Sequence, residues 1–167
     1  MDEVTLNGVS KLLSNPSWDV IVILFFVAAG FFYGLFTGKS RLVSILISTY
    51  VAAFVFENFR YFDFLVAGRS VLETFLIRAS SFFLLLIVAA MIISRFMVRR
   101  DFEARVWWQA FGLSFLEVGF VIALMFQFLP AREFFEFSPL VEKLFAGTEA
   151  FSWWLLIPLL ALWLFFG

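Results

Sequence analysis

The stretch "AAGFFYGLFTGKSRLVSILIS", residues 28–48, decides how this chain folds, because it places small residues at fixed intervals within apolar sequence. Glycine and then serine recur at every fourth position, at Gly30, Gly34, Gly38, Ser40, Ser44 and Ser48. Residues four apart share one face of a helix, so the stretch predicts two helices that each carry a stripe of small residues. What such stripes do depends on the solvent around the helices.

The composition of the 167-residue chain indicates that this solvent is lipid. Hydrophobic residues make up 63% of the chain and charged residues 15%, and the mean hydropathy is +1.01. A soluble domain has roughly 45–50% apolar and about 25% charged residues, so this excess is too large for one small core. We therefore expect a protein whose main partner is the lipid bilayer, and the net charge of -1 gives no indication of nucleic-acid binding.

Apolar segments of the length that a bilayer requires recur along the chain. A hydrocarbon core of about 30 Å needs about 20 helical residues, fewer if flanking groups snorkel. Four segments meet this requirement, at residues 20–37, 42–56, 80–98 and 106–129. The expected fold class is all-α: a polytopic helical membrane protein with four transmembrane helices plus a short C-terminal hydrophobic helix.

That last helix, at residues 151–167, is short and contains Pro158, so it predicts either a fifth span or a helix lying partly in the membrane interface. At the other end, residues 1–18 form a polar tail without the basic start of a cleaved signal peptide. We therefore expect the first span to be retained, and residues 19–129 to form one four-span membrane domain.

Two connecting segments, 57–78 and 130–150, mix charged and aromatic residues and are predicted to be amphipathic helices in the interface. In the second segment, Ser138 can cap a helix and Pro139 fits its first position. Gly147 is placed where that helix would stop, before Thr148 begins the next.

Basic residues in short loops set the expected orientation. They flank the first turn and crowd the link between spans three and four, at Lys39, Arg41, Arg95, Arg99, Arg100 and Arg105. Short loops rich in Lys and Arg stay in the cytoplasm, so we expect a multi-pass protein of the inner (plasma) membrane with its N-terminus outside. Tryptophan pairs at 107–108 and 153–154 would then form aromatic belts on opposite faces.

The stripes of small residues are predicted to be a packing device. Helices in lipid associate through close packing and interhelical hydrogen bonds. We expect the glycine stripe of the first span to pack against the serine stripe of the second, with the serine hydroxyls reaching backbone carbonyls. The alternative is that the cleft between the stripes lines a path for a substrate.

The intramembrane polar candidates are Glu117, Ser114, Arg95 and Arg78. An acidic side chain at mid-bilayer is unfavourable by about 2.5–3.5 kcal/mol, so Glu117 must face the bundle or a water-filled cavity, or be protonated. It could handle protons or cations, or it could make a structural hydrogen bond to a serine such as Ser44 or an ion pair with one of the two arginines. Each arginine could instead snorkel to its own interface.

An enzyme is the least favoured class. The chain has no histidine and no cysteine, which excludes the usual zinc sites, a cysteine nucleophile and a histidine base. No phosphate-cradling glycine loop is present outside the apolar segments. We therefore expect no catalytic residues, no metal and no cofactor.

The order of these features resembles the colicin V production protein family. The resemblance rests on Asp19 before an apolar run, the glycine stripe, the basic turn 39–41 and the serine-bearing second helix. Further along, "FGLSFLEVGFVIALMFQFLP" (111–130) is similar to that family's glycine-rich helix with an internal charge, and a Ser-Pro-Leu segment follows at 138–140. The aromatic-rich segment 60–78 and the short helix at the chain end depart from the family's pattern.

This resemblance implies a bacterial inner-membrane protein that assists toxin production or export, or envelope homeostasis, as a homo-oligomer or with other membrane proteins. It implies no catalytic residues. The alternative hypothesis is a small proton- or ion-conducting channel or transporter that works through Glu117. A lesion-forming, holin-like role is a third, although four or five spans exceed what that role needs.

Overall fold

The computed structural model describes residues 18–59, 61–97, 107–129 and 136–166. Its elements are α2 (Trp18–Thr37), α3 (Lys39–Asn58), α4 (Tyr61–Val66), α5 (Val71–Met97), α6 (Trp107–Phe128), α7 (Pro139–Val141), the π-helical turn η2 (Glu142–Ala146) and α8 (Thr148–Phe166). Within these ranges every regular element is helical, which confirms the all-α fold class. Residues 1–17 of the polar tail, and Arg99, Arg100 and Arg105, lie outside the described residues.

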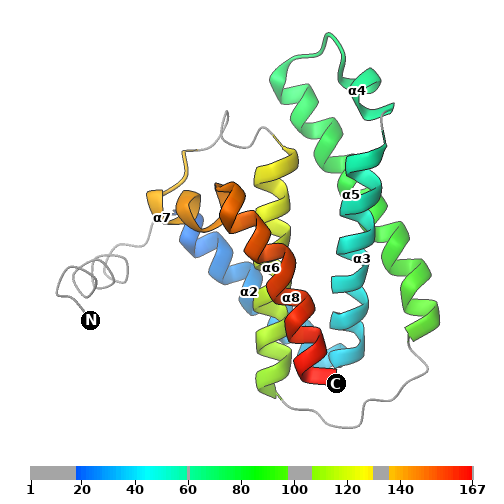
Figure 1. Cartoon of the computed structure of the whole chain (residues 1–167), viewed down its shortest axis with the longest axis vertical. Coiled ribbons are helices and arrows are strands. Elements are labelled where there is room, and N and C mark those ends of the chain that lie inside the picture. Colours follow the sequence, from blue (N-terminus) through cyan, green and yellow to red (C-terminus); the bar gives the residue numbers. More distant parts are fainter. Residues whose placement is uncertain (1–17, 60, 98–106, 130–135, 167) are drawn as a thin grey trace, which may run out of the picture.

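Four of these helices, α2, α3, α5 and α6, are long and apolar enough to cross a membrane, as predicted. A fifth span arises if the segment 139–146 and α8, which are bent by 63° to each other, count as one. In Figure 1, α8 runs beside α6 from the end of the bundle near α7 to the end where α2 turns into α3. The fold is that of a multi-pass helical membrane protein.

The third span begins earlier than its hydropathy predicts. We expected an interfacial helix over 57–78 and a span from about residue 80, whereas α5 begins at Val71 and only the short α4 remains between α3 and α5. The cause is a capping box: the Glu73 N–H donates to Ser70 Oγ at 3.3 Å, and the Ser70 N–H donates to Glu73 Oε2 at 3.0 Å. Gly68, at φ 74°, provides the left-handed turn before it.

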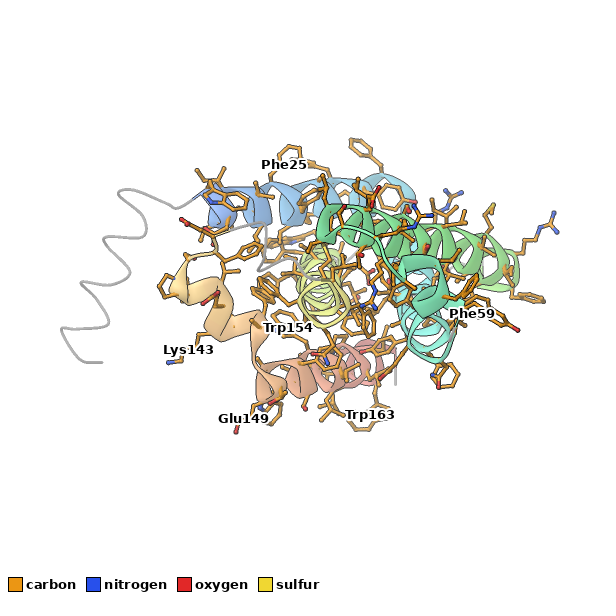
Figure 2. The ribbon with its side chains drawn as sticks, turned by 90° about the horizontal axis from the view of Figure 1, so that it is seen from above. Phe25, Phe59, Lys143, Glu149, Trp154 and Trp163 are labelled. Carbon is orange, nitrogen blue, oxygen red and sulfur yellow. The ribbon has the colours of Figure 1, made fainter. Side chains whose placement is uncertain are left out.

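The central helix of the bundle is α6. It packs against α2, α3 and α8, whereas α5 packs mainly on α3. The view from above in Figure 2 shows α6 between α2 on one side and α8 on the other. The core between α3 and α6 is built from side chains that are almost completely buried, among them Leu46, Leu113, Phe120 and Leu124.

The two stripes of small residues do not pack against each other, so that prediction is wrong. Gly30 faces α6, where an added Cβ would lie 3.4 Å from Ser114 Cβ, and only Gly34 faces α3, at Leu42. The small side chain of Ser114 allows α2 to approach α6 closely at Gly30. Gly38 serves the turn instead, with φ 88°.

The serine hydroxyls do reach backbone carbonyls, but within their own helix. Ser44 Oγ donates to Ser40 O at 3.0 Å, and Ser48 Oγ donates to Ser44 O. Both serines are buried, so these bonds satisfy hydroxyls that would otherwise face hydrocarbon. The stripe therefore provides a run of satisfied hydroxyls along α3.

Helix α8 docks on α6 through Trp154 and Gly119. The Trp154 ring covers Gly119 so closely that an added Cβ would lie 2.1 Å from two ring carbons. The indole Nε1–H donates to Leu144 O at 2.9 Å, and the ring stacks on Phe145 with centroids 5.0 Å apart. Figure 2 shows Trp154 turned inward and Trp163 outward, so the predicted belt at 153–154 places only Trp153 at the surface.

The approach to α8 follows the predicted signals. Ser138 caps α7 by accepting the Val141 N–H, Pro139 occupies the first helical position, and Gly147 separates η2 from α8. Pro158 lies buried within α8. Trp107 and Trp108 are exposed at the opposite end of the bundle from this segment.

Candidate functional site

The site centres on Glu117, which faces α3 from the middle of α6. Its Oε1 accepts a hydrogen bond from Thr49 Oγ1 at 2.6 Å. Its Oε2 is buried and has no hydrogen-bond partner among the described residues. Buried carboxylate oxygens are ordinarily paired, so an oxygen left without a partner within an apolar bundle marks a candidate site.

The helix starts explain why Thr49 meets Glu117. Both α3 and α6 begin at the end of the bundle that contains the turn at Gly38, and they run in the same direction. Thr49 and Glu117 each lie ten residues beyond the first residue of their helix, and therefore at the same level. Ser44, which we named as one example of a serine that could make a structural hydrogen bond to Glu117, lies more than one turn closer to that end, and the hydroxyl that meets Glu117 belongs to Thr49 instead.

Thr49 has two acceptors within reach and only one hydroxyl proton. Its Oγ1 lies 2.6 Å from Glu117 Oε1 and 3.1 Å from Ile45 O, one turn back in its own helix. An ionised Glu117 accepts the Thr49 proton. A protonated Glu117 can instead donate to Thr49 Oγ1, while Thr49 donates to Ile45 O. The same heavy-atom geometry therefore accommodates both charge states of the carboxyl group.

Neither arginine forms an ion pair with Glu117 among the described residues. Arg78 Nη1 donates to Phe128 O at 3.4 Å, beyond the far end of the site, and Arg95 is exposed near the end of α5. The described residues therefore do not support the alternative in which Glu117 forms an ion pair with an arginine. The exposed position of Arg95 is the one expected of a side chain that snorkels to the interface.

Tyr50 closes the site on the side of α8. Its ring lies 4.4 Å from that of Phe120, and its hydroxyl donates to Leu155 O at 2.6 Å. Ser114, another of the intramembrane polar candidates, turns elsewhere: it is buried against α2 and donates to Ala110 O at 2.8 Å. The polar partners of Glu117 thus come from α3.

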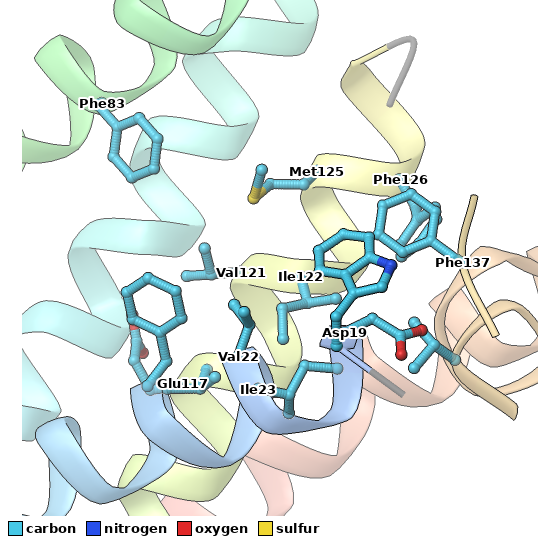
Figure 3. Close-up of a pocket in the computed structure, with 14 residues that line it drawn as sticks. Asp19, Val22, Ile23, Phe83, Glu117, Val121, Ile122, Met125, Phe126 and Phe137 are labelled. Atoms are coloured by element: carbon cyan, nitrogen blue, oxygen red, sulfur yellow. The ribbon is translucent and has the colours of Figure 1, made fainter. Parts of the chain in front are cut away.

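A cavity of about 360 Å³ extends from Glu117 along the groove between α2 and α6. Figure 3 shows Glu117 and Asp19 toward opposite ends of it, with Val121, Ile122 and Met125 between them. Its surface is entirely apolar, so Glu117 lines it with carbon atoms while the carboxylate turns toward Thr49.

At the far end of this cavity, Asp19 connects α2 to the segment before α7 through a hydrogen bond. It is only 2% exposed, and its Oδ2 accepts a hydrogen bond from the Ser138 N–H at 2.7 Å. A carboxylate in the first turn of a helix is also favoured by the helix dipole. Sequence reasoning did not predict this contact, although an acid at the start of an apolar helix was visible in the sequence.

No group of three or more acidic side chains in the described part of the chain could hold a metal ion. No family model, no curated protein and no solved structure matches the chain. The fold and the site together define a multi-pass helical membrane protein with a buried carboxyl group in its central helix.

Proposed function

We propose that this membrane protein moves protons or small cations across the bilayer through Glu117. The observation that carries the proposal is the buried Oε2 of a carboxyl group that has no hydrogen-bond partner in the described part of the chain and whose other oxygen accepts from a neutral hydroxyl. An ionised carboxylate kept only for packing needs partners for its charge, because an unpaired buried charge is strongly destabilising. Intramembrane acids that lack such partners are typical of ion and proton pathways.

The contacts of Thr49 are suited to a Glu117 carboxyl group that gains and loses a proton during transport. Because its hydroxyl can serve either Glu117 or Ile45 O, Glu117 keeps one hydrogen bond in each protonation state. The transition between the two states then requires a hydroxyl rotation rather than a helix movement.

Flux in proteoliposomes tests the proposal. Purified wild type should carry protons or cations under an imposed proton gradient and membrane potential, and Glu117→Gln should abolish the flux while its helical content stays intact. Glu57→Gln is the matched control, because Glu57 is exposed at the end of α3 and should leave the flux unchanged. Absence of flux in the wild type, or undiminished flux in Glu117→Gln, would contradict the proposal.

For the orientation, we propose that the turn at Gly38 and the adjoining ends of α5 and α6 face the cytoplasm of a bacterial cell. These features lie at one end of the bundle in Figure 1, and the short loops there are the basic ones in the sequence. Cysteine accessibility tests the assignment, since the chain has no cysteine of its own. Asn58→Cys, at the other end, should react with an impermeant thiol reagent added outside intact cells.

A second candidate is the membrane factor that the resemblance to colicin V production proteins implies, acting in toxin production, export or envelope homeostasis. It is favoured by the exposed surface of α5. In the apolar stretch of that helix only 11% of the residues are buried, whereas in the apolar stretch of α3 50% are buried. Such a surface is available to another copy or to a different membrane protein. Gentle purification should then recover an oligomer or a reproducible partner, and a monomer without flux or partner would count against both candidates.

A further inference from the structure

A second cavity lies between α2, α3 and α5, closer to the turn at Gly38 than the apolar one. It has a volume of about 340 Å³, and its surface is partly polar. It is lined from three helices, by Tyr33 of α2, by residues of α3 that include Arg41 and Ser44, and by residues of α5 that include Ser94. Water can occupy a space of this size when it offers polar partners.

The inner end of this polar cavity lies one helical turn from Thr49, the hydrogen-bond partner of Glu117. Ile45 lines the cavity, and Thr49 is the next residue on the same face of α3, about 6 Å further along its axis. Thr49 Oγ1 lies within hydrogen-bond distance of both Ile45 O and Glu117 Oε1. Thr49, which is completely buried and lies one turn beyond the cavity lining, therefore links Ile45 to the carboxyl group through its hydroxyl.

Access from the other end of the bundle is different in kind. There the cavity beside Glu117 has an entirely apolar surface, and Asp19 at its far end is bonded to the Ser138 N–H. Among the described residues, the titratable groups facing Glu117 are Tyr50 beside it and Asp19 across the cavity, and no lysine or arginine lines that cavity. The surface of this apolar cavity therefore offers water and protons no polar partners.

The ligands at Glu117 also distinguish a proton from a metal cation. Cations such as Ca²⁺ and Mg²⁺ take about six or more oxygen ligands. Glu117 offers one carboxylate and one neighbouring hydroxyl, with no acidic cluster in the described residues to complete a shell. A proton needs one oxygen and one acceptor, and both are present.

From these observations we propose that the substrate of the site is the proton, and that it reaches Glu117 through Thr49 from the polar cavity at the Gly38 end. This inference rests on the proposed function and adds the substrate and the side of entry. In the transfer, Thr49 gives its hydroxyl proton to Glu117 Oε1 and takes a replacement that a hydronium ion from the polar cavity supplies, and that ion is left as water. The neutralised Glu117 then donates to Thr49 Oγ1, while the new Thr49 proton turns to Ile45 O, so one proton has entered and Thr49 is unchanged.

Labelling with dicyclohexylcarbodiimide tests the side of entry. This apolar reagent enters from the lipid and attacks protonated carboxyl groups, and mass spectrometry counts the adduct at Glu117. Vesicles are prepared with different internal and external pH, and their orientation is read from impermeant labelling of Asn58→Cys. The initial rate should follow the pH on the Gly38 side, falling about tenfold per pH unit once the carboxylate form predominates. It should respond much more weakly to the pH on the other side, because proton exchange along the apolar cavity is the slow step of transport.

Variants of Thr49 test the relay. Thr49→Val has nearly the same shape without the hydroxyl and should lose the response to pH on the Gly38 side, whereas Thr49→Ser should keep it. Glu117→Gln should remove the adduct, and Glu57→Gln should leave it unchanged. If Thr49→Val does not fold, the comparison of the two compartments in the wild type still decides the side.

Labelling that follows the pH on the opposite side, on both sides equally, or on neither side overturns the inference, and with wild-type flux intact the proposed function would stand. An unchanged pH response in folded Thr49→Val overturns the relay through Thr49. Absence of wild-type flux removes the proposed function, and the inference with it, whatever the labelling shows.

Discussion

The contact between Gly119 and Trp154 makes Gly119→Ala the most incisive test of how α8 is held. An alanine Cβ would lie 2.1 Å from Cη2 and Cζ3 of the Trp154 ring, where ordinary contact is about 3.5 Å. The ring must therefore retreat by more than about 1 Å. That movement separates its Nε1–H from Leu144 O, now 2.9 Å away, and disturbs its stack on Phe145.

The expected cost follows from these contacts. A lost hydrogen bond costs about 1 kcal/mol, a disturbed aromatic pair about 0.5–1.5 kcal/mol, and overpacking itself typically about 1–3 kcal/mol. These losses overlap, because one ring movement causes all of them. Alanine also gains about 1 kcal/mol over glycine within a helix. We expect a net loss of about 2 kcal/mol in the free energy of unfolding.

Unfolding by SDS titration in mild-detergent micelles, followed by far-UV circular dichroism, measures this loss. Gly147→Ala is the control, since an added Cβ there meets nothing closer than 3.9 Å. In a Trp154→Ala background the penalty of Gly119→Ala should disappear, because the ring is gone. Wild-type stability of Gly119→Ala would refute the docking of α8 on α6 through this contact.

Three further substitutions test individual hydrogen bonds. Ser70→Ala removes the acceptor of the Glu73 N–H and should lower the free energy of unfolding by about 1 kcal/mol, with faster hydrogen exchange in the first turn of α5. The control Ser80→Ala, at an exposed position within the same helix, should change neither the stability nor the exchange. Asp19→Ala leaves the Ser138 N–H without its carboxylate and should cost about 2 kcal/mol, with faster exchange of the Ser138 amide; unchanged exchange would contradict the contact. Tyr50→Phe loses only the bond to Leu155 O, so thermal unfolding should report about 1 kcal/mol, and a loss as large as that of Tyr50→Ala would contradict this reading.

The helices and the span count could be predicted from sequence because length and apolar content are local properties. The start of α5 could also have been found, since Ser70 and Glu73 have the spacing of a capping box. Their signal was obscured by the surrounding charges, which favoured an interfacial helix. A cap, rather than hydropathy, decides where this helix begins.

The partners of the small residues could not be predicted in the same way. A stripe of glycines shows that another backbone can approach, but not which one, and Gly30 meets α6 rather than the neighbouring α3. Thr49 and Glu117 are 68 residues apart in sequence, and only the common starting end of α3 and α6 places them at one level. Membership in the colicin V production family stays a prediction.

The single proton that Thr49 can give to either of two acceptors has a consequence for how the protein can be observed. The charged and neutral forms of Glu117 differ by one hydrogen atom and one hydroxyl torsion, while every heavy atom can keep its place. Coordinates obtained in acid and in alkali should therefore superimpose around α3 and α6. The carbonyl stretch of a protonated carboxylic acid, seen in infrared difference spectra, would distinguish two states that diffraction would record as one.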